Sequence, residues 1–276
     1  MDENQIARVD VEEIVKAKLP GRKLPGFVIR YLKKIVHQDE INYIYKSTPG
    51  QKNLSFIKSV LDYLKITYSV EGLENLPRET GCIFASNHPL GGLDGIILAY
   101  VLGSEYDEDI HLLTNDILLF VEPLQSMFIP VNKVGAQGKE NVEKLNEFYL
   151  SGKSLITFPS GKCSRKTKGV IVDPEWKKNF VAKSVQYKRD VVPVYFEGRN
   201  SNFFYNLSNI RTGLGVKVNL EMLYLADEFF KQKGAHFTIK IGKPIPWQTF
   251  DKSKSQQDWA AEVRKIVYKL PLDSKA

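Results

Sequence analysis

One segment between two short apolar runs constrains the fold of this chain more than any other. The first run covers residues 81–84 and the second covers residues 96–102, and the segment between them is rich in glycine. The first run is typical of a buried strand and the second of a buried helix. The sequence therefore predicts a strand–loop–helix unit whose loop carries two titratable side chains, His88 and Asp94. Such loops carry function more often than the elements they join.

The chain after residue 66 continues this alternation. Apolar or alternating runs predict strands near residues 66–70, 110–113, 154–158, 191–196 and 236–241. Helical spacing predicts helices over 137–150, 179–187 and 255–270, a mostly helical stretch over 201–233, and irregular structure over 117–131. Strands that alternate with helices are typical of an α/β fold. We expect a single domain over residues 66–276, with a mixed sheet flanked by helices.

The first part of the chain has a different pattern. Helical spacing recurs over residues 9–19, 24–36, 39–47 and 54–66, so residues 1–65 are expected to form a helical N-terminal segment. Within residues 24–36, Arg30, Lys33 and Lys34 lie apart from the apolar positions. A basic amphipathic helix of this kind can lie in a membrane interface. The alternative is a helix that packs on the domain.

Charge and composition limit the classes of partner. The 276 residues carry a net charge of +7, which suits nucleic acid, anionic lipid headgroups or a phosphorylated substrate. Nucleic-acid binding is the alternative function from another class, but Lys and Arg are dispersed and no recognised nucleic-acid-binding signature is present. No apolar run approaches the ~20 residues of a spanning helix, so a membrane contact is expected to be peripheral.

The His and the Asp are the residue types of a general base. An imidazole takes the proton from a nucleophile, while a carboxylate holds its tautomer and stabilises the imidazolium. Gly91 and Gly92 give the backbone freedom to bring Asp94 toward His88. No adjacent Ser or Cys is placed as a nucleophile, which favours attack by a hydroxyl or amine of the substrate. The alternative is an ordinary loop His, with Asp94 as a helix N-cap.

Four ordered blocks carry a resemblance to a known family. Residues 86–94, with Asn87, His88 and Asp94, resemble the N-H-x-x-x-x-D motif of the glycerophospholipid acyltransferase superfamily. Residues 128–133, 158–165 and 192–194 are similar to its second, third (F-P-E-G) and fourth blocks. The resemblance implies His88 and Asp94 as catalytic residues. The substrate-binding residues that it implies are Asn87, Lys133, Phe158, Pro159, Ser160, Gly161, Lys162 and Arg165.

The chain departs from the family pattern at two positions. Five residues separate His88 from Asp94, where the family usually has four, so one glycine is the candidate extra residue. Ser160 stands where the family usually has Glu, which belongs to the glycerol phosphate site of the common subfamily. The F-P-S-G form is more similar to the hemolysin-like branch. That branch includes O-acyltransferases of lyso-ornithine and related amino-acid lipids.

The resemblance implies an O-acyltransferase that moves a fatty acyl group from a thioester of acyl-carrier protein or coenzyme A to a lysolipid hydroxyl. The acceptor is expected to be a lyso-amino-acid lipid, with 1-acylglycerol-3-phosphate as the alternative. The implied mechanism uses no bound cofactor, no metal and no covalent intermediate. A zinc site is not expected from the sequence either, because Cys82 and Cys163 form no Cys/His cluster. The implied location is peripheral, on the cytoplasmic face of the inner membrane.

Two other nucleophiles are weaker alternatives. A lipid hydrolase would use Ser160 or Ser164, but the F-P-S-G order lacks the G-x-S-x-G turn that exposes a nucleophilic serine. An acyl-cysteine relay would use Cys163, but a free cysteine usually serves as a small packing residue. Lys166 and Lys168 are interpreted as a solvated basic loop or a general attraction to membranes.

Overall fold

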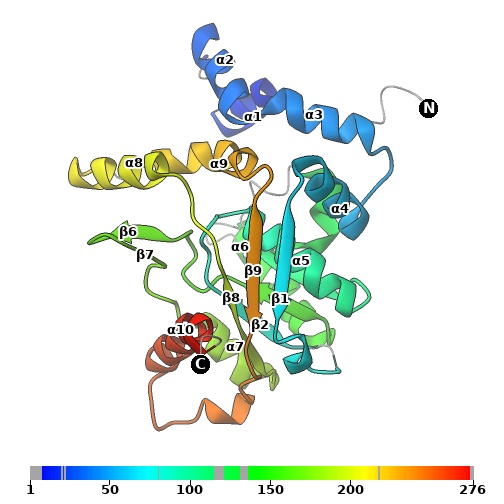
Figure 1. Cartoon of the computed structure of the whole chain (residues 1–276), viewed down its shortest axis with the longest axis vertical. Helices are drawn as coiled ribbons and strands as arrows, with labels where there is room; N and C mark the ends of the chain where they lie inside the picture. Colours follow the sequence, from blue (N-terminus) through cyan, green and yellow to red (C-terminus); the bar gives the residue numbers. More distant parts are fainter. Residues whose placement is uncertain are drawn as a thin grey trace.

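A seven-stranded mixed sheet forms the centre of the protein (Figure 1). The computed structural model describes residues 8–19, 21, 23–79, 81–114, 121–130, 136–216 and 218–273. The strand order is β1-β9-β8-β2-β5-β3-β4. The strands are β1 (Thr67–Glu71), β2 (Ile83–Ser86), β3 (Ile110–Thr114), β4 (Phe128–Pro130), β5 (Ser154–Thr157), β8 (Val191–Phe196) and β9 (His236–Ile241). The mixed α/β fold expected from the sequence is confirmed.

Strand direction places three loops at one edge of this sheet. Strands β8, β2, β5, β3 and β4 pair in parallel, whereas β9 runs antiparallel to β8 and parallel to β1. Ile83 lies opposite Leu155 in β5 and Val191 in β8. Because the carboxyl ends of parallel strands meet at the same edge, the loops after β2, β5 and β8 converge there. We call this the carboxyl edge.

Helices cover both faces of the sheet. Side chains alternate along a strand, so Phe84 joins one core with α4 (Asn53–Leu64) and α5 (Leu93–Glu105). Its neighbours Ile83 and Ala85 join the other core, with α7 (Asn179–Tyr187) and α10 (Gln256–Asp273). The end of α6 (Ala136–Leu150) contributes Tyr149 to that second core. The central strands are buried on both faces, which explains their continuous apolar sequence.

The N-terminal helices lie where the sequence predicts them. They are α1 (Val11–Lys18), α2 (Gly26–Ile35) and α3 (Gln38–Ser47), and they sit at one end of the molecule beside α9 (Leu225–Lys231) (Figure 1). His37 joins the two groups, since its Nε2 lies 3.0 Å from Asp227 Oδ1 and its ring stacks on Phe230. Helix α4 packs in the same core as Phe84.

Two segments differ from the expectation. Lys166 and Lys168, interpreted as a solvated basic loop, lie in an antiparallel hairpin of β6 (Arg165–Thr167) and β7 (Val170–Val172). Its two turn residues, Lys168 and Gly169, both have positive φ, as the tight turns of hairpins require. Residues 128–130, expected to be irregular, form β4 beside β3.

The segment 201–233 is mostly helical, as expected. It contains α8 (Asn202–Gly213), the 3-10 helix η5 (Leu220–Tyr224) and α9. Further 3-10 helices are η2 (Leu73–Asn75), η4 (Glu122–Met127) and η6 (Trp247–Thr249). Within the described ranges, every helix is too short or too polar to cross a bilayer.

Candidate active site

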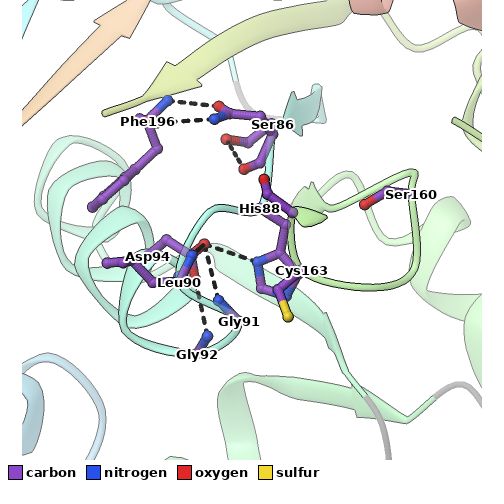
Figure 2. Close-up of polar contacts among 12 residues, drawn as sticks. Ser86, His88, Leu90, Gly91, Gly92, Asp94, Ser160, Cys163 and Phe196 are labelled. Atoms are coloured by element: carbon purple, nitrogen blue, oxygen red, sulfur yellow. Dashed lines mark hydrogen bonds and ion pairs between the residues drawn. The ribbon is translucent and has the colours of Figure 1, made fainter. Parts of the chain in front are cut away.

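His88 and Asp94 form a hydrogen-bonded pair at the carboxyl edge (Figure 2). His88 follows β2, Asp94 lies in the first turn of α5, and His88 Nδ1 is 2.9 Å from Asp94 Oδ2. The carboxylate therefore fixes the tautomer with the proton on Nδ1, which leaves the lone pair on Nε2. The His88 side chain is 16% exposed and Asp94 is fully buried. The longer spacer between the two residues does not prevent their contact.

Backbone amides hold the Asp94 carboxylate in its ionised form. Burial opposes ionisation, but the charge and hydrogen bond of His88 and the surrounding amides lower the pKa of Asp94 below its ordinary value. Four amides donate to its two oxygens at 2.9–3.4 Å, those of Leu90, Gly91, Gly92 and Gly95. The loop between strand and helix thus forms a cradle for one negative charge beside the imidazole.

Gly91 allows this loop to fit under the neighbouring chain. Its φ is +80°, a conformation that favours glycine. A Cβ at this position would lie 2.9 Å from Leu225 Cδ2 and 3.1 Å from the Cβ of Cys163. Glycine is therefore required here both by backbone conformation and by space.

Asn87 attaches the same loop to the end of β8. Its Nδ2 donates to the Phe196 carbonyl at 2.9 Å, and the Phe196 amide donates to its Oδ1 at 2.7 Å. We expected Asn87 to bind substrate, but its buried amide group is used by the backbone of β8. Its contacts position the β2 loop instead.

The loop after β5 supplies the other wall of the site. The Phe158 ring stacks on the His88 imidazole, with centroids 3.8 Å apart and planes inclined by 17°. The backbone amide of Ser164 donates to the His88 carbonyl at 2.7 Å. Pro159 is buried, and its carbonyl accepts from the Lys177 amide. The third block of the sequence thus meets the first block around His88.

The serine hydroxyls of this loop are bonded to other groups. Ser160 Oγ donates to the Lys162 carbonyl at 2.7 Å, and Ser164 Oγ donates to Asp173 Oδ1 at 2.6 Å. Both serines are buried. Figure 2 shows Ser160 on a part of the loop away from the pair of His88 and Asp94. This geometry does not favour either serine as a nucleophile.

Asp173 was not identified from the sequence, although it lies under the His88 backbone. Its two oxygens accept from the His88 amide at 3.2 and 3.3 Å, and Oδ2 accepts from Trp176 Nε1 at 2.9 Å. Burial raises the pKa of Asp173, against the hydrogen bonds from Ser164, Trp176 and His88. The only sequence signal is an acid directly after the apolar run 170–172. Asp173 joins the β2 loop, the β5 loop and β7.

Cys163 and Arg165 belong to a buried network behind the loop. Burial raises the pKa of the Cys163 thiol, although Arg165 Nη1 donates to its sulfur at 2.9 Å. Arg165, expected to bind substrate, forms an ion pair with buried Glu221 at 3.0 Å. Burial opposes ionisation of Glu221, but its own backbone amide, Arg211 and Arg165 lower its pKa. Arg165 therefore joins β6 to η5.

Two lysines lie at the turn of the β5 loop. Lys162 is exposed next to Gly161, whose φ of +65° shapes the turn. Lys177, which the sequence did not single out, places Nζ 2.9 Å from the position of a Cβ on Gly161. Lys133, expected to bind the acceptor, lies outside the described residues. Within the described residues, no group of three or more metal-ligating side chains occurs.

Two known enzymes are similar to this chain in sequence. A lyso-glycine lipid O-acyltransferase of Bacteroides thetaiotaomicron is 48% identical over 98% of this chain and 100% of its own length. A lyso-glycine lipid O-acyltransferase of Phocaeicola vulgatus is 47% identical over 98% of both chains. The crystal structure of the 1-acyl-sn-glycerophosphate (LPA) acyltransferase PlsC of Thermotoga maritima covers 87% of this chain and 95% of its own, with 19% identity and a TM-score of 0.48.

A protein-family model described as acyltransferase matches residues 12–275, which includes most of the helical N-terminal segment as well as the sheet. The match covers all four sequence blocks and nearly the whole chain. The two relatives are close to half identical to this chain over nearly their full length, which agrees with the match to the family model. The chain belongs to this acyltransferase family and is an acyltransferase.

Proposed function

We propose that this enzyme transfers a fatty acyl group from an acyl thioester to the hydroxyl of a lyso-glycine lipid, with His88 as general base. The pair of His88 Nδ1 and Asp94 Oδ2, 2.9 Å apart at the carboxyl edge, is the observation that carries the chemistry. The acceptor class is proposed from the two relatives, which are named for lyso-glycine lipid. The donor is acyl-carrier protein or coenzyme A as its thioester.

In the proposed reaction, His88 Nε2 takes the proton of the acceptor hydroxyl as its oxygen attacks the thioester carbon. Asp94 stabilises the imidazolium through Nδ1, and the stacked Phe158 ring keeps the imidazole in place. The tetrahedral intermediate then loses the carrier sulfur, which leaves as the thiol after it receives the proton. The products are an ester and the free carrier. A general base of this kind contributes roughly 10²–10⁴-fold.

Lys162 of the β5 loop and Lys177, which lies between β7 and α7, are proposed to bind the headgroup. A glycine joined to a fatty chain through its nitrogen presents one carboxylate, which a lysine can bind as a point charge. Lys162 is exposed at the turn, and Lys177 lies against Gly161. Ser160 is small and its hydroxyl is bonded within the loop, so it adds no negative charge that would oppose a carboxylate. Lys133 is a third candidate for the headgroup.

The test offers the purified enzyme three acceptors in one mixture: a lyso-glycine lipid, a lyso-ornithine lipid and 1-acylglycerol-3-phosphate. The donor is palmitoyl-coenzyme A in one series and palmitoyl-acyl-carrier protein in another, and products are identified by mass spectrometry. We expect the diacyl glycine lipid as the main product. Acylation of 1-acylglycerol-3-phosphate alone would refute the acceptor, and release of free fatty acid alone would refute acyl transfer.

His88→Ala is the variant that tests the base, with His236→Ala as its matched control. His236 begins β9, is exposed, and contacts Thr67 and Ser69 of β1, so its loss leaves the pair of His88 and Asp94 untouched. We expect His88→Ala to lose at least about 100-fold in kcat, because the base is absent. His236→Ala should retain wild-type activity. Equal activity of both variants would remove His88 from the mechanism.

A further inference from the structure

Helix α8 is apolar on two faces, only one of which packs on the protein. Phe204 and Tyr205 are fully buried against Cys163 and its neighbours. Phe203, Ile210 and Leu214 point away from that core, and Ile210 and Leu214 are 62% and 75% exposed. Their spacing of seven and four residues places them on one side of the helix. A second apolar stripe that faces water calls for a partner.

The chain after α8 extends this surface. We define the apolar arm by its exposed members, which are Phe203, Ile210, Leu214, Val216, Val218, Leu220 and Leu223. Figure 1 shows α8 reaching sideways beyond the sheet, next to the β6–β7 hairpin. The arm follows β8 and so starts from the carboxyl edge, as the His88 loop does.

Helix α2 continues the apolar arm. The hydroxyls of Tyr31 and Tyr224 lie 2.5 Å apart, and the Tyr224 ring packs edge-on against Phe203 at 5.0 Å between centroids. Phe27, one helical turn before Tyr31, is strongly exposed. Two segments far apart in sequence thus form one outward surface with several exposed aromatic and aliphatic side chains.

The charge around the apolar arm identifies its partner as an anionic surface. Residues 14–38, which include α2, contain Lys and Arg but no Asp or Glu, and so do residues 162–172 of the β5 loop and hairpin. Between Arg199 and Ala226 the only acid is Glu221, which is buried and paired with Arg165 and Arg211. Apolar side chains next to segments with a net positive charge match the acyl boundary and headgroups of an anionic bilayer.

A polar network fixes the apolar arm to the active-site loop. Glu221 of η5 binds Arg165 of β6, and Arg165 follows Ser164, whose amide donates to the His88 carbonyl. Arg211 of α8 binds the same Glu221 at 2.8 Å. The arm and the His88 loop are therefore joined through Glu221, Arg165 and the Ser164 amide.

We propose that the apolar arm enters the interface of an anionic bilayer and so presents the carboxyl edge to lipid in that membrane. The inference rests on the proposed lysolipid acceptor, since such an acceptor resides in the bilayer. Apolar side chains enter the acyl boundary while the basic segments lie at the headgroups. The acceptor then reaches His88 from the membrane without transfer through water.

The experiment uses the full chain and vesicles of phosphatidylcholine with or without 30% phosphatidylglycerol, a composition chosen for the test. Leu214→Asp places a charge in the apolar arm, and Leu150→Asp is the matched control. Leu150 is 76% exposed, against 75% for Leu214, and ends α6 at the opposite edge, just before β5 begins. Co-sedimentation measures binding, and Val218→Asp provides a second arm variant outside α8.

We expect wild type and Leu150→Asp to bind the anionic vesicles equally, and the two arm variants to bind at least about tenfold more weakly. Wild-type binding should also weaken as salt is raised. Unchanged binding of both arm variants, with unchanged melting temperatures, would overturn the proposal. A wild-type dimer in light scattering that Leu214→Asp converts to a monomer would overturn it too, because the arm would then join two copies.

Activity on a short-chain acceptor below its micelle concentration separates this proposal from the proposed function. Such an acceptor does not need the membrane, so Leu214→Asp should retain wild-type kcat on it. The same variant should lose activity on acceptor embedded in vesicles. If wild type acylates no acceptor but still binds vesicles through the arm, the proposed function fails and the membrane surface stands.

Discussion

Asp94→Asn replaces a buried carboxylate by an amide of the same shape, and the structure shows why no orientation of the amide fits. One oxygen of Asp94 accepts from His88, Leu90 and Gly91, and the other accepts from Gly92 and Gly95. An Asn NH₂ group must face one of these two sets of donors. Either orientation leaves two backbone amides unpaired, and one of the two also turns the Asn donor toward the imidazole.

The expected loss of kcat and of stability in Asp94→Asn can be worked out from these contacts. A hydrogen bond to a charged group is worth roughly 1.5–3 kcal/mol, so loss of the ionic partner of the imidazolium costs about 10–150-fold in rate. A wrong tautomer adds to this, since the same change in a Ser-His-Asp triad lowers kcat about 10⁴-fold. We expect Asp94→Asn to lower kcat by about 10²–10⁴-fold. The two unpaired amides should also cost roughly 2–4 kcal/mol of stability.

The assay follows release of the carrier thiol from the acyl thioester in the presence of acceptor, at saturating concentrations of both. A double-mutant cycle shows whether Asp94 acts through the imidazole. If it does, the variant with both His88→Ala and Asp94→Asn is no slower than His88→Ala alone. A kcat of Asp94→Asn within about threefold of the wild-type kcat would refute the reasoning. So would a double variant whose kcat is lower than that of His88→Ala by the same factor that Asp94→Asn alone produces.

Three further predictions concern the surrounding residues. Cys163→Ala should keep kcat within about twofold, and wild type should form no acyl-enzyme by mass spectrometry, because the thiol is buried and its pKa is raised; a large loss would favour a cysteine relay. Asp173→Asn should flatten the pH dependence of the unfolding free energy measured with urea. Burial raises the pKa of Asp173, so its protonated carboxyl group stabilises the folded state fully below the unfolded pKa of 3.8, and this stabilisation is lost as pH rises through the folded pKa. Identical pH profiles of the unfolding free energy for wild type and Asp173→Asn would contradict this. Gly91→Ala should lower stability by about 1–3 kcal/mol, measured by the same urea titration, because of its positive φ and its contact with Leu225; a neutral effect would show that the loop can rearrange.

The pair at the centre of the site could be predicted from the sequence because all of its determinants are local. His88, the glycines and Asp94 occupy one strand–loop–helix unit, and the apolar runs on either side specify that unit. The alternation of strands and helices likewise predicted the α/β sheet. The pattern therefore predicted that His88 and Asp94 share one loop, but the preference for a catalytic pair over an ordinary loop His with a helix N-cap came from the family resemblance.

Contacts between distant segments could not be predicted in this way. Asp173 reaches the His88 amide across 85 residues, and Arg165 finds Glu221 across 56 residues. A local pattern shows that an acid follows an apolar run, or that a loop is basic. It does not show which distant residue the acid or the basic side chain contacts. The β6–β7 hairpin was missed for a related reason. Its strand Arg165–Thr167 is polar, and its Lys168–Gly169 turn lacks the usual Asn-Gly or Asp-Gly signal.

The stack of Phe158 on His88 restricts how a proton can travel through the proposed reaction. Phe158 covers one face of the imidazole and Asp94 binds Nδ1, and these two contacts hold the ring in one orientation. A single nitrogen, Nε2, must then serve both the incoming alcohol and the outgoing sulfur. In the proposed reaction, the thioester of the donor and the hydroxyl of the acceptor must therefore both come close to the Nε2 atom of His88.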